Sequence, residues 1–319
     1  MIGLRLLPFL FLATTYMLQA QQLSLFTQYR ENAAIINPAA LESDFLAFGH
    51  NATIGVSYRA QWVGLSGAPT TQTLRGSYLN TEWSGVTLMA GGHLINDQTG
   101  PTGFTGLYGR VAAILTNDVQ VGGLILGLSA GFVQYRVNAS EILLQDPNDV
   151  LGTVDQTQGY PDIGAGLYFY QTIGGPRGED YFYAGVSVPQ VFGLDLAFQN
   201  DAGEYNIQRV QHIYGMLGMY KFFDNGGFLE PSVWVKSVSG APINADVNLR
   251  YQMPSALWIG AGGATSGTAH LEGGLTIGED AGFTNTLRIG YGFDYSFSSF
   301  GPAAGSTHEV NLSFSFGGY

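Results

Sequence analysis

Apolar and polar residues alternate without exception in one stretch near the end of the chain. Its apolar set is Leu287, Ile289, Tyr291, Phe293, Tyr295 and Phe297, and its other set is Arg288, Gly290, Gly292, Asp294 and Ser296. Because successive side chains of a strand point to opposite faces, this pattern predicts a strand with one apolar and one polar face. A soluble sandwich would cover the apolar face with a second sheet. An outer-membrane barrel would turn it to lipid and the polar face to a lumen.

The composition decides between these two architectures. Of 319 residues, 45% are hydrophobic and only 11% are charged, against about 25% charged in an average soluble domain. The best helical candidate beyond the N-terminus, Val119 to Tyr135, is broken by four glycines and two glutamines, so it lacks the roughly 18 apolar residues of a membrane helix. Alternating strands remain, and they predict an all-β fold, a transmembrane antiparallel up-and-down barrel in the outer membrane.

Fourteen such segments are expected, an even number as in bacterial single-chain barrels. They are Thr53–Arg59, Thr71–Asn80, Ser84–Leu94, Gly103–Leu115, Val119–Arg136, Asp162–Gln171, Tyr181–Val188, Arg209–Phe222, Phe228–Ser237, Ile243–Gln252, Ala256–Ala264, Ala269–Ile277, Thr284–Phe297 and His308–Phe316. The longest connections, Val137 to Pro161 and Pro189 to Gln208, follow the fifth and seventh strands. With both termini in the periplasm, these long loops face outward.

The register of the strands predicts the two faces of the wall. Lipid-facing positions should be Ile289, Tyr291, Phe293, Val247, Leu249, Leu312 and Phe314, and lumen-facing positions Arg288, Asp294, Asp246, Arg250 and Glu272. A charge on the lipid face near the membrane centre costs about 2–4 kcal/mol.

The N-terminus has the features of an export signal. Arg5 precedes the apolar run Leu6 to Met17, and Ala20 is a small residue at a plausible cleavage point. The alternative is a buried or membrane N-terminal helix. We expect residues 1–20 to be a signal peptide, 21–52 an N-terminal periplasmic or plug segment, and 53–319 the barrel. The lumen of fourteen strands needs a filler, and the candidates are Gln22 to Asp44 and the Arg59 to Thr70 connection, with Phe26 and Trp62 as anchors.

Three motifs do not alternate. Phe26-Thr27-Gln28-Tyr29 and Asn37-Pro38-Ala39-Ala40 lie in the N-terminal segment, and Tyr58 to Leu74 contains Arg-Ala-Gln-Trp-Val-Gly-Leu-Ser-Gly-Ala-Pro-Thr-Thr-Gln-Thr. Gly64, Gly67 and Pro69 rule out a regular strand, so an irregular connection is expected there. Arg59, Gln61 and Trp62 are suited to folding it over the lumen. The motif then serves either as a rigid loop between strands or as a contact for a partner.

These motifs resemble the PorP/SprF family of the Bacteroidetes type IX secretion system. The family begins with Phe-Ser-Gln-Tyr and Asn-Pro-Ala, and Thr27 replaces its serine here; the block after Tyr58 resembles its Tyr-Arg-x-Gln-Trp-x-Gly-x-x-Gly-Ala-Pro-x-Thr-Gln-Thr. Looser matches include Tyr160-Pro161-Asp162 and Thr307-His308-Glu309. The candidate partner-binding or loop residues are Phe26, Gln28, Tyr29, Asn37, Pro38, Arg59, Gln61, Trp62, Gly64, Gly67, Ala68, Pro69, Thr71 and Gln72.

The resemblance implies a non-enzymatic outer-membrane component that secretes cargo proteins, such as gliding adhesins, together with periplasmic ring proteins. Two other functions stay open. A general porin or solute channel is compatible with any barrel. A hydrolase embedded in the barrel wall would need a serine, a histidine and an acid that meet, and the sequence singles out no such set.

Charge and candidate ligands narrow the chemistry further. The net charge of −12 and pI near 4.6 argue against nucleic acid as a partner. The chain has no cysteine, which excludes thiolate metal sites and thiol catalysis. The five histidines lack metal-ligand spacing, and the acids of the long loop, Glu141, Asp146, Asp149 and Asp155, lack that of a calcium loop. We therefore expect no cofactor, and read His270 with Glu272, and Arg288 with Asp294, as members of a polar lumen network.

Overall fold

A computed structural model describes residues 24–80, 87–142, 154–174, 180–200, 203–278, 281–298 and 301–318. The signal peptide expected over residues 1–20, and Asp146, Asp149 and Tyr319, lie outside these ranges. The helices are α1 (Ala33–Ile36), α2 (Ser43–Phe48), the 3₁₀ turn η1 (Ala139–Glu141) and α3 (Gly301–Ala304). The strands are β1 (Ala52–Ala60), β2 (Thr70–Asn80), β3 (Thr87–Thr99), β4 (Thr102–Leu115), β5 (Gly122–Val137), β6 (Gln156–Ile173), β7 (Asp180–Val188), β8 (Asp195–Asn200), β9 (Gly203–Gln208), β10 (His212–Phe222), β11 (Phe228–Val238), β12 (Asn244–Gln252), β13 (Leu257–Ala264), β14 (Thr268–Ile277), β15 (Thr286–Ser296) and β16 (Thr307–Phe316).

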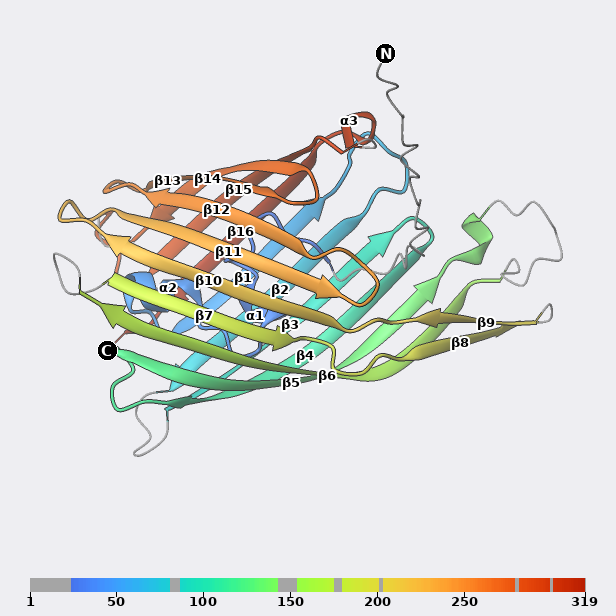
Figure 1. The fold of residues 1–319 in the computed structure, drawn as a ribbon, viewed down its shortest axis with the longest axis horizontal. Coiled ribbons are helices and arrows are strands. Elements are labelled where there is room, and N and C mark those ends of the chain that lie inside the picture. Colours follow the sequence, from blue (N-terminus) through green and yellow to red (C-terminus); the bar gives the residue numbers. More distant parts are fainter. Residues whose placement is uncertain are drawn as a thin grey trace, which may run out of the picture.

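Fourteen of these strands close into one antiparallel barrel (Figure 1). β1 pairs with β2 on one side and with β16 on the other, where Ala52 faces Phe316 and Ala60 faces His308. Closure leaves no free sheet edge, which is what a sheet in lipid requires. The predicted fold class and number of strands are confirmed.

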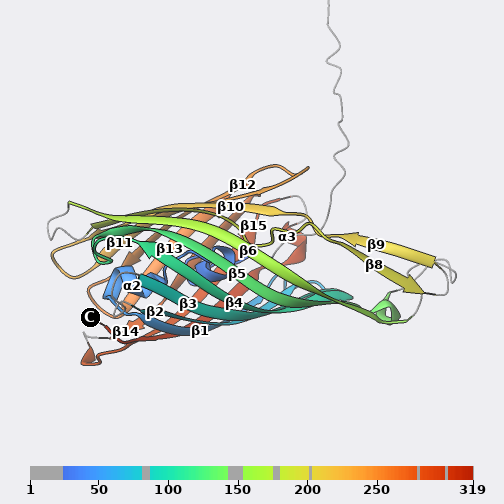
Figure 2. The same cartoon turned by 90° about the horizontal axis from the view of Figure 1, so that it is seen from below.

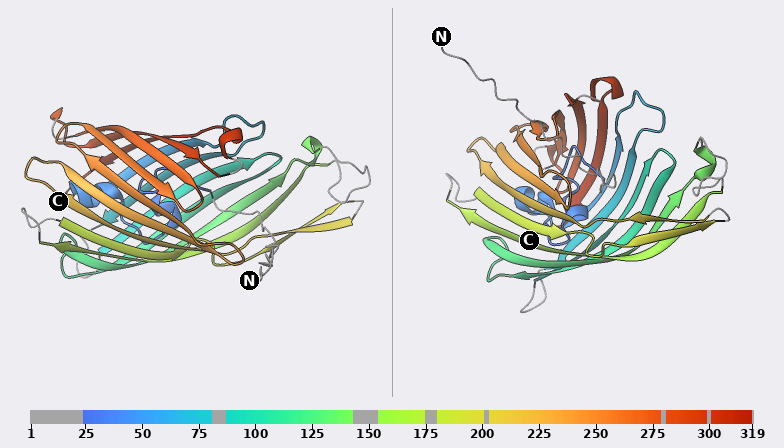
Figure 3. Two further views of the ribbon diagram at one scale, coloured as in Figure 1. Left: turned by 45° about the horizontal axis from the view of Figure 1, so that its top comes forward. Right: turned by 45° about the vertical axis from the view of Figure 1, so that its right-hand side comes forward.

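The two ends of the barrel differ. The C-terminus and α2 lie at one end, whereas the connection from β1 to β2, α3 and the β8–β9 hairpin lie at the other (Figure 3). Barrels keep their termini and short turns in the periplasm, so we call the end with the C-terminus the inner end and the opposite end the outer end.

Most predicted strand ends differ from the structure by no more than three residues, and three predictions were wrong by more. β3 continues to Thr99 and β6 already begins at Gln156, so both strands extend beyond the 9–11 residues that cross a bilayer. The expected loop from Pro189 to Gln208 contains the separate hairpin β8–β9, which extends away from the barrel (Figure 2). This hairpin is held by aromatic packing, since Phe198 stacks on Tyr205 at 5.2 Å and packs against Tyr135 of β5. Sequence alternation alone did not indicate those contacts.

The predicted faces of the wall are confirmed. Val247 and Leu249 are 56% and 50% exposed, while Arg250, the next residue of the same strand, is 3% exposed. The same division holds in β15 and β16, where Ile289, Tyr291, Leu312 and Phe314 are exposed and Arg288 and Asp294 are buried. The apolar face therefore forms the outside of the barrel. None of the helices in the described ranges is long and apolar enough to cross a membrane.

Candidate functional site

The lumen is filled by the N-terminal segment, residues 24–50, which we call the plug. Its first described residue lies near the outer end, where Ser24 Oγ donates to Asp97 Oδ2 of β3 at 2.7 Å. Its last residue lies at the inner end, where His50 Nδ1 is 2.9 Å from the Gly317 carbonyl. Phe26, Gln28 and Asn37 are at most 5% exposed. We expected this segment to lie either in the periplasm or in the lumen as a plug. Its described residues lie in the lumen.

The first motif of the plug binds to strands β1 and β16. The backbone N–H of Thr27 donates to Glu309 Oε2 at 2.6 Å, and Asn32 Nδ2 donates to Glu309 Oε1 at 3.2 Å. Arg59 Nη1 donates to Thr27 Oγ1 at 2.5 Å. Thr27 and Glu309, two residues of separate family motifs, are therefore joined in the lumen, with Arg59 against both.

A single carboxylate in the middle of the plug is surrounded by arginines of the wall. Glu31, 2% exposed, has Oε1 3.0 Å from Arg250 Nη1 and 3.2 Å from Arg288 Nη1, and Oε2 3.6 Å from Arg75 Nη2. These arginines come from strands β12, β15 and β2, and Arg288 also pairs with Asp44 of α2. One carboxylate thus ties three separate strands to the plug.

The second motif approaches the wall where glycines replace side chains. Asn37 Oδ1 accepts the N–H of Ala39 at 2.9 Å, and Asn37 Nδ2 donates to the Leu167 carbonyl of β6 at 3.0 Å. A Cβ on Gly166 would overlap Asn37, and one on Gly127 would overlap Ala39. Glycine is therefore required here because the plug backbone lies directly against the wall.

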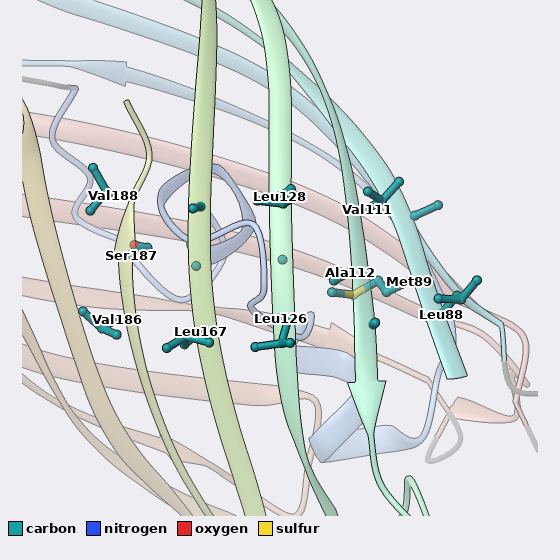
Figure 4. Close-up of a pocket in the computed structure, with 15 residues that line it drawn as sticks. Leu88, Met89, Val111, Ala112, Leu126, Leu128, Leu167, Val186, Ser187 and Val188 are labelled. Atoms are coloured by element: carbon teal, nitrogen blue, oxygen red, sulfur yellow. The ribbon is translucent and has the colours of Figure 1, made fainter. Parts of the chain in front are cut away.

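The lipid-facing surface of this same wall is concave. A groove of about 670 Å³ lies over β3 to β7, and two of its lining side chains, Val111 and Leu128, are 62% and 58% exposed. Figure 4 shows these strands with the N-terminal segment behind them. The groove is apolar, as expected for a surface that faces acyl chains.

The long motif after Tyr58 does not fill the lumen, contrary to one of our expectations. Its connection lies at the outer rim, with Val63 and Leu65 53% and 37% exposed. It rests on the β15–β16 connection, because Gly64 N–H donates to the Ala304 carbonyl at 3.1 Å. Trp62 is only partly buried and has a φ of 52°, in the left-handed region. The anchor in the lumen is Phe26, whereas Trp62 belongs to the rim.

The other candidate residues divide between these two places. Gln28, Tyr29, Pro38 and Arg59 belong to the plug and its contacts, and Thr71 faces the lumen, where its hydroxyl donates to Asp97 at 2.7 Å. The rim holds the rest of the motif, namely Gln61, Gly64, Gly67, Ala68 and Pro69, while Gln72 is exposed on the outside of β2.

Sequence reasoning missed the ionic partners of the plug. Arg30 pairs with Glu230 at 2.9 Å, and Arg110 pairs with Glu42 at 3.1 Å and donates to the Ala40 carbonyl at 2.8 Å. The sequence signal that could have indicated these pairs was the presence of charged residues on the lumen-facing side of the alternating strands. The strand alternation gave the direction of Arg250 and Arg288, but not the plug carboxylate that they bind.

The polar network expected in the lumen is present, but His270, Glu272, Arg288 and Asp294 each bind residues other than the ones with which we had paired them. Glu272 binds Arg250 at 3.3 Å, whereas His270 contacts Asn248. Arg288 and Asp294 likewise share a face but have separate partners. Within the described ranges, no group of three or more metal-binding side chains is found.

Two solved structures to which the chain is similar with TM-scores above 0.5 have the same barrel fold. CymD, a monoaromatic hydrocarbon channel, is 12% identical with a TM-score of 0.51, over 91% of this chain and 92% of that one. The deltaS2S3 mutant of the channel TodX is 11% identical with a TM-score of 0.51, over 89% and 94%. The translocator domain of autotransporter NalP from Neisseria meningitidis is 11% identical with a TM-score of 0.48, over 86% and 91%. At such identities the likeness concerns the fold alone.

Sequence comparison is more specific. No curated protein matches the chain. The family described as type IX secretion system membrane protein PorP/SprF matches residues 18–314. This match includes the plug and the rim motif and reaches into all fourteen wall strands, and the chain belongs to the PorP/SprF family of type IX secretion system membrane proteins.

Proposed function

We propose that this protein is a plugged, non-enzymatic barrel of the outer membrane that takes part in the secretion of a cargo protein, with gliding adhesins as one class of cargo. The observation that carries the proposal is the family match over residues 18–314. A signal peptide at residues 1–20 would deliver the chain to the periplasm for insertion. Lipid, periplasmic ring proteins and the cargo are the proposed partners.

The filled lumen favours this role over that of a general porin. Glu31 and Glu309 tie the plug to the wall through ion pairs and backbone hydrogen bonds, and breaking such buried pairs costs about 3–5 kcal/mol. A solute channel needs an unobstructed path. The proposed protein therefore works through its surfaces, not through a permanently open pore.

Two surfaces suit two kinds of partner. At the outer end, Val63 and Leu65 of the rim motif expose apolar side chains on a connection held rigid by Ala304, and we assign the cargo contact to it. At the inner end, Phe48 of α2 is 38% exposed. The first motif of the plug is buried and is not available to a partner. We therefore assign the contact with periplasmic ring proteins to the surface around Phe48.

Secretion assays in a strain that lacks the gene test this proposal. Complementation with the wild type should restore export of the cognate cargo, whereas Leu65→Asp should leave the barrel in the outer membrane and reduce export. Val154→Asp changes a residue that is 67% exposed in a different outer loop and should export normally. Full export in the deletion strain, with no paralogue present and with reduced uptake of small solutes, would support the porin alternative instead.

A further inference from the structure

The hairpin β8–β9 is an open sheet beside a closed one. In the part of the chain that the structure describes, β8 and β9 pair only with each other. The hairpin projects from the outer end, beyond the turns of the neighbouring wall strands (Figure 1). A two-stranded sheet has two edges, and each edge presents backbone N–H and C=O groups that barrel closure does not pair.

The register of the hairpin shows which backbone groups point outward. The N–H of Arg209 donates to the Leu194 carbonyl at 2.8 Å, one step beyond the end of the β8–β9 ladder. Hydrogen-bonded pairs alternate with non-bonded pairs in antiparallel strands, so every second residue of β9 bonds to β8. The residues between them, Glu204, Asn206 and Gln208, therefore direct their N–H and C=O groups away from β8.

The two edges of the hairpin differ in what they contact. The outward backbone groups of Glu204, Asn206 and Gln208 bond to no other residue in the described ranges. On the opposite edge, the Ala197 carbonyl of β8 accepts Gln158 Nε2 of β6 at 3.0 Å. The edge of β9 is therefore the open one.

This edge lacks the usual protection against pairing. Natural sheets block an exposed edge with lysine, proline or a bulge. The sequence of β9, Gly-Glu-Tyr-Asn-Ile-Gln, contains neither lysine nor proline, and its register with β8 runs over six residues without a bulge. Six extended residues span about 20 Å. An edge of this length is a template for one strand of another chain.

The side chains of the hairpin define the strand that fits. Tyr205 and Ile207 are half-buried on the face that carries the fully buried Phe198, whereas Glu204 points to the exposed face. An added strand would continue both faces, so its residues should alternate between apolar and polar. Asp195 and Glu204 are the charged residues of the two strands, and basic residues on the polar face of the added strand complement them.

We propose that the open edge of β9 binds an extended segment of another polypeptide as a third strand, with alternating apolar residues and basic residues on its polar face. Backbone hydrogen bonds supply the affinity of such strand addition, and the side chains supply the specificity. A second copy of this hairpin is a poorer occupant because it brings two further acids and no base. The proposal does not depend on the secretion role: peptide binding tests the edge, whereas export tests the role.

Fluorescence anisotropy with the full-length barrel in detergent tests the edge with three labelled peptides. The first is Thr-Val-Lys-Val-Thr-Ile-Lys-Val-Thr, the second has the same side chains with N-methyl groups on both backbone edges, and the third has glutamate in place of lysine. The first should bind at least about tenfold more tightly than the N-methylated peptide, and more tightly than the glutamate peptide. Equal binding of the first two peptides, or no binding of the first, overturns the proposal. A barrel that instead forms dimers through β9 would identify a second copy as the occupant and would also overturn it.

Matched variants locate the binding on β9. Asn206→Pro removes an outward N–H without removing a bond to β8 and should lower the affinity at least about tenfold, whereas Asn206→Ala keeps this N–H and should bind like the wild type. Ala197→Pro makes the same change on the opposite edge and should also bind normally. Glu204→Gln removes a charge from the exposed face of β9 and should weaken the lysine peptide about threefold. Unchanged affinity in Asn206→Pro, or an equal loss in both proline variants, overturns the assignment to β9.

Discussion

Glu31 and Arg288 are separated by 257 residues in the sequence and meet in the lumen, with Oε1 3.2 Å from Nη1. Glu31 belongs to the plug and Arg288 to β15 near the end of the chain. The contact can form only when the barrel has closed around the segment, so it links the position of the plug to the completed fold. The same carboxylate also holds Arg250, which makes it the residue whose loss should affect the plug most.

Replacement of Glu31 by glutamine should loosen the plug and leave the barrel intact. Arg250 and Arg288 would remain buried without the carboxylate charge, which costs about 3–5 kcal/mol. Conductance in planar bilayers should rise, and protease should cleave within residues 24–50. Glu204→Gln is the control. An unchanged, closed barrel would show that the ion pairs do not retain the plug.

The stability change on replacing a glycine of the barrel wall by alanine should depend on which atoms the new Cβ contacts. In Gly166→Ala the Cβ overlaps Asn37, so we expect about 1–3 kcal/mol of destabilisation from overpacking. A Cβ on Gly109 of β4 would meet no atom within 4 Å, and Gly109→Ala should be neutral or slightly stabilising. Denaturant unfolding in detergent measures both. Similar losses in the two variants would contradict direct contact with the plug.

Trp62 offers a test of backbone conformation. Its φ of 52° costs an L-residue about 1–2 kcal/mol, a cost that glycine does not incur. Both Trp62→Ala and Trp62→Gly lose the partly buried ring, but the glycine variant should be more stable by about 1 kcal/mol. Thermal unfolding of the pair measures the difference. A more stable alanine variant would mean that the rim connection changes conformation.

Charge on the outside of the barrel should matter only within the membrane. Val247→Arg places a cation at the middle of β12 and should cost about 2–4 kcal/mol. Ile243→Arg changes a residue of similar exposure, 64% against 56%, in the outer turn, and should cost little. The two variants are compared by the yield of folded barrel after insertion into lipid vesicles. Equal effects would contradict the outward orientation of Val247.

The outer loop after β5 should respond to acid. Asp155 Oδ1 accepts from the backbone N–H and the hydroxyl of Ser140, at 3.0 and 2.7 Å, and these bonds lower the pKa of Asp155. A lowered pKa stabilises the folded loop above the unfolded value of about 3.9, and the contribution disappears as the pH falls through the folded value. The protection of the amides of residues 138–141 against hydrogen exchange, measured relative to the intrinsic rate at each pH, should therefore fall below about pH 4. In Asp155→Asn the protection of the same amides should not change over this range.

The sequence by itself determined the wall of this protein. Alternation at residues such as Val247 and Arg250 sets which side faces lipid, because a strand has only two faces and a buried charge on the lipid side is too costly. Fourteen strands and their direction follow from the same local rule. The rim motif could likewise be recognised from its glycines and proline, which are incompatible with a regular strand.

Only the tertiary structure decided how the lumen is filled and which charges meet there. The partners of Glu31 come from β2, β12 and β15, and the partners of Glu309 come from the plug and β1. No local pattern contains these pairs, since they form only after closure brings distant strands around one segment. For the same reason, the rim location of Trp62 and the open edge of β9 follow from the arrangement of separate turns and strands, which sequence spacing does not specify.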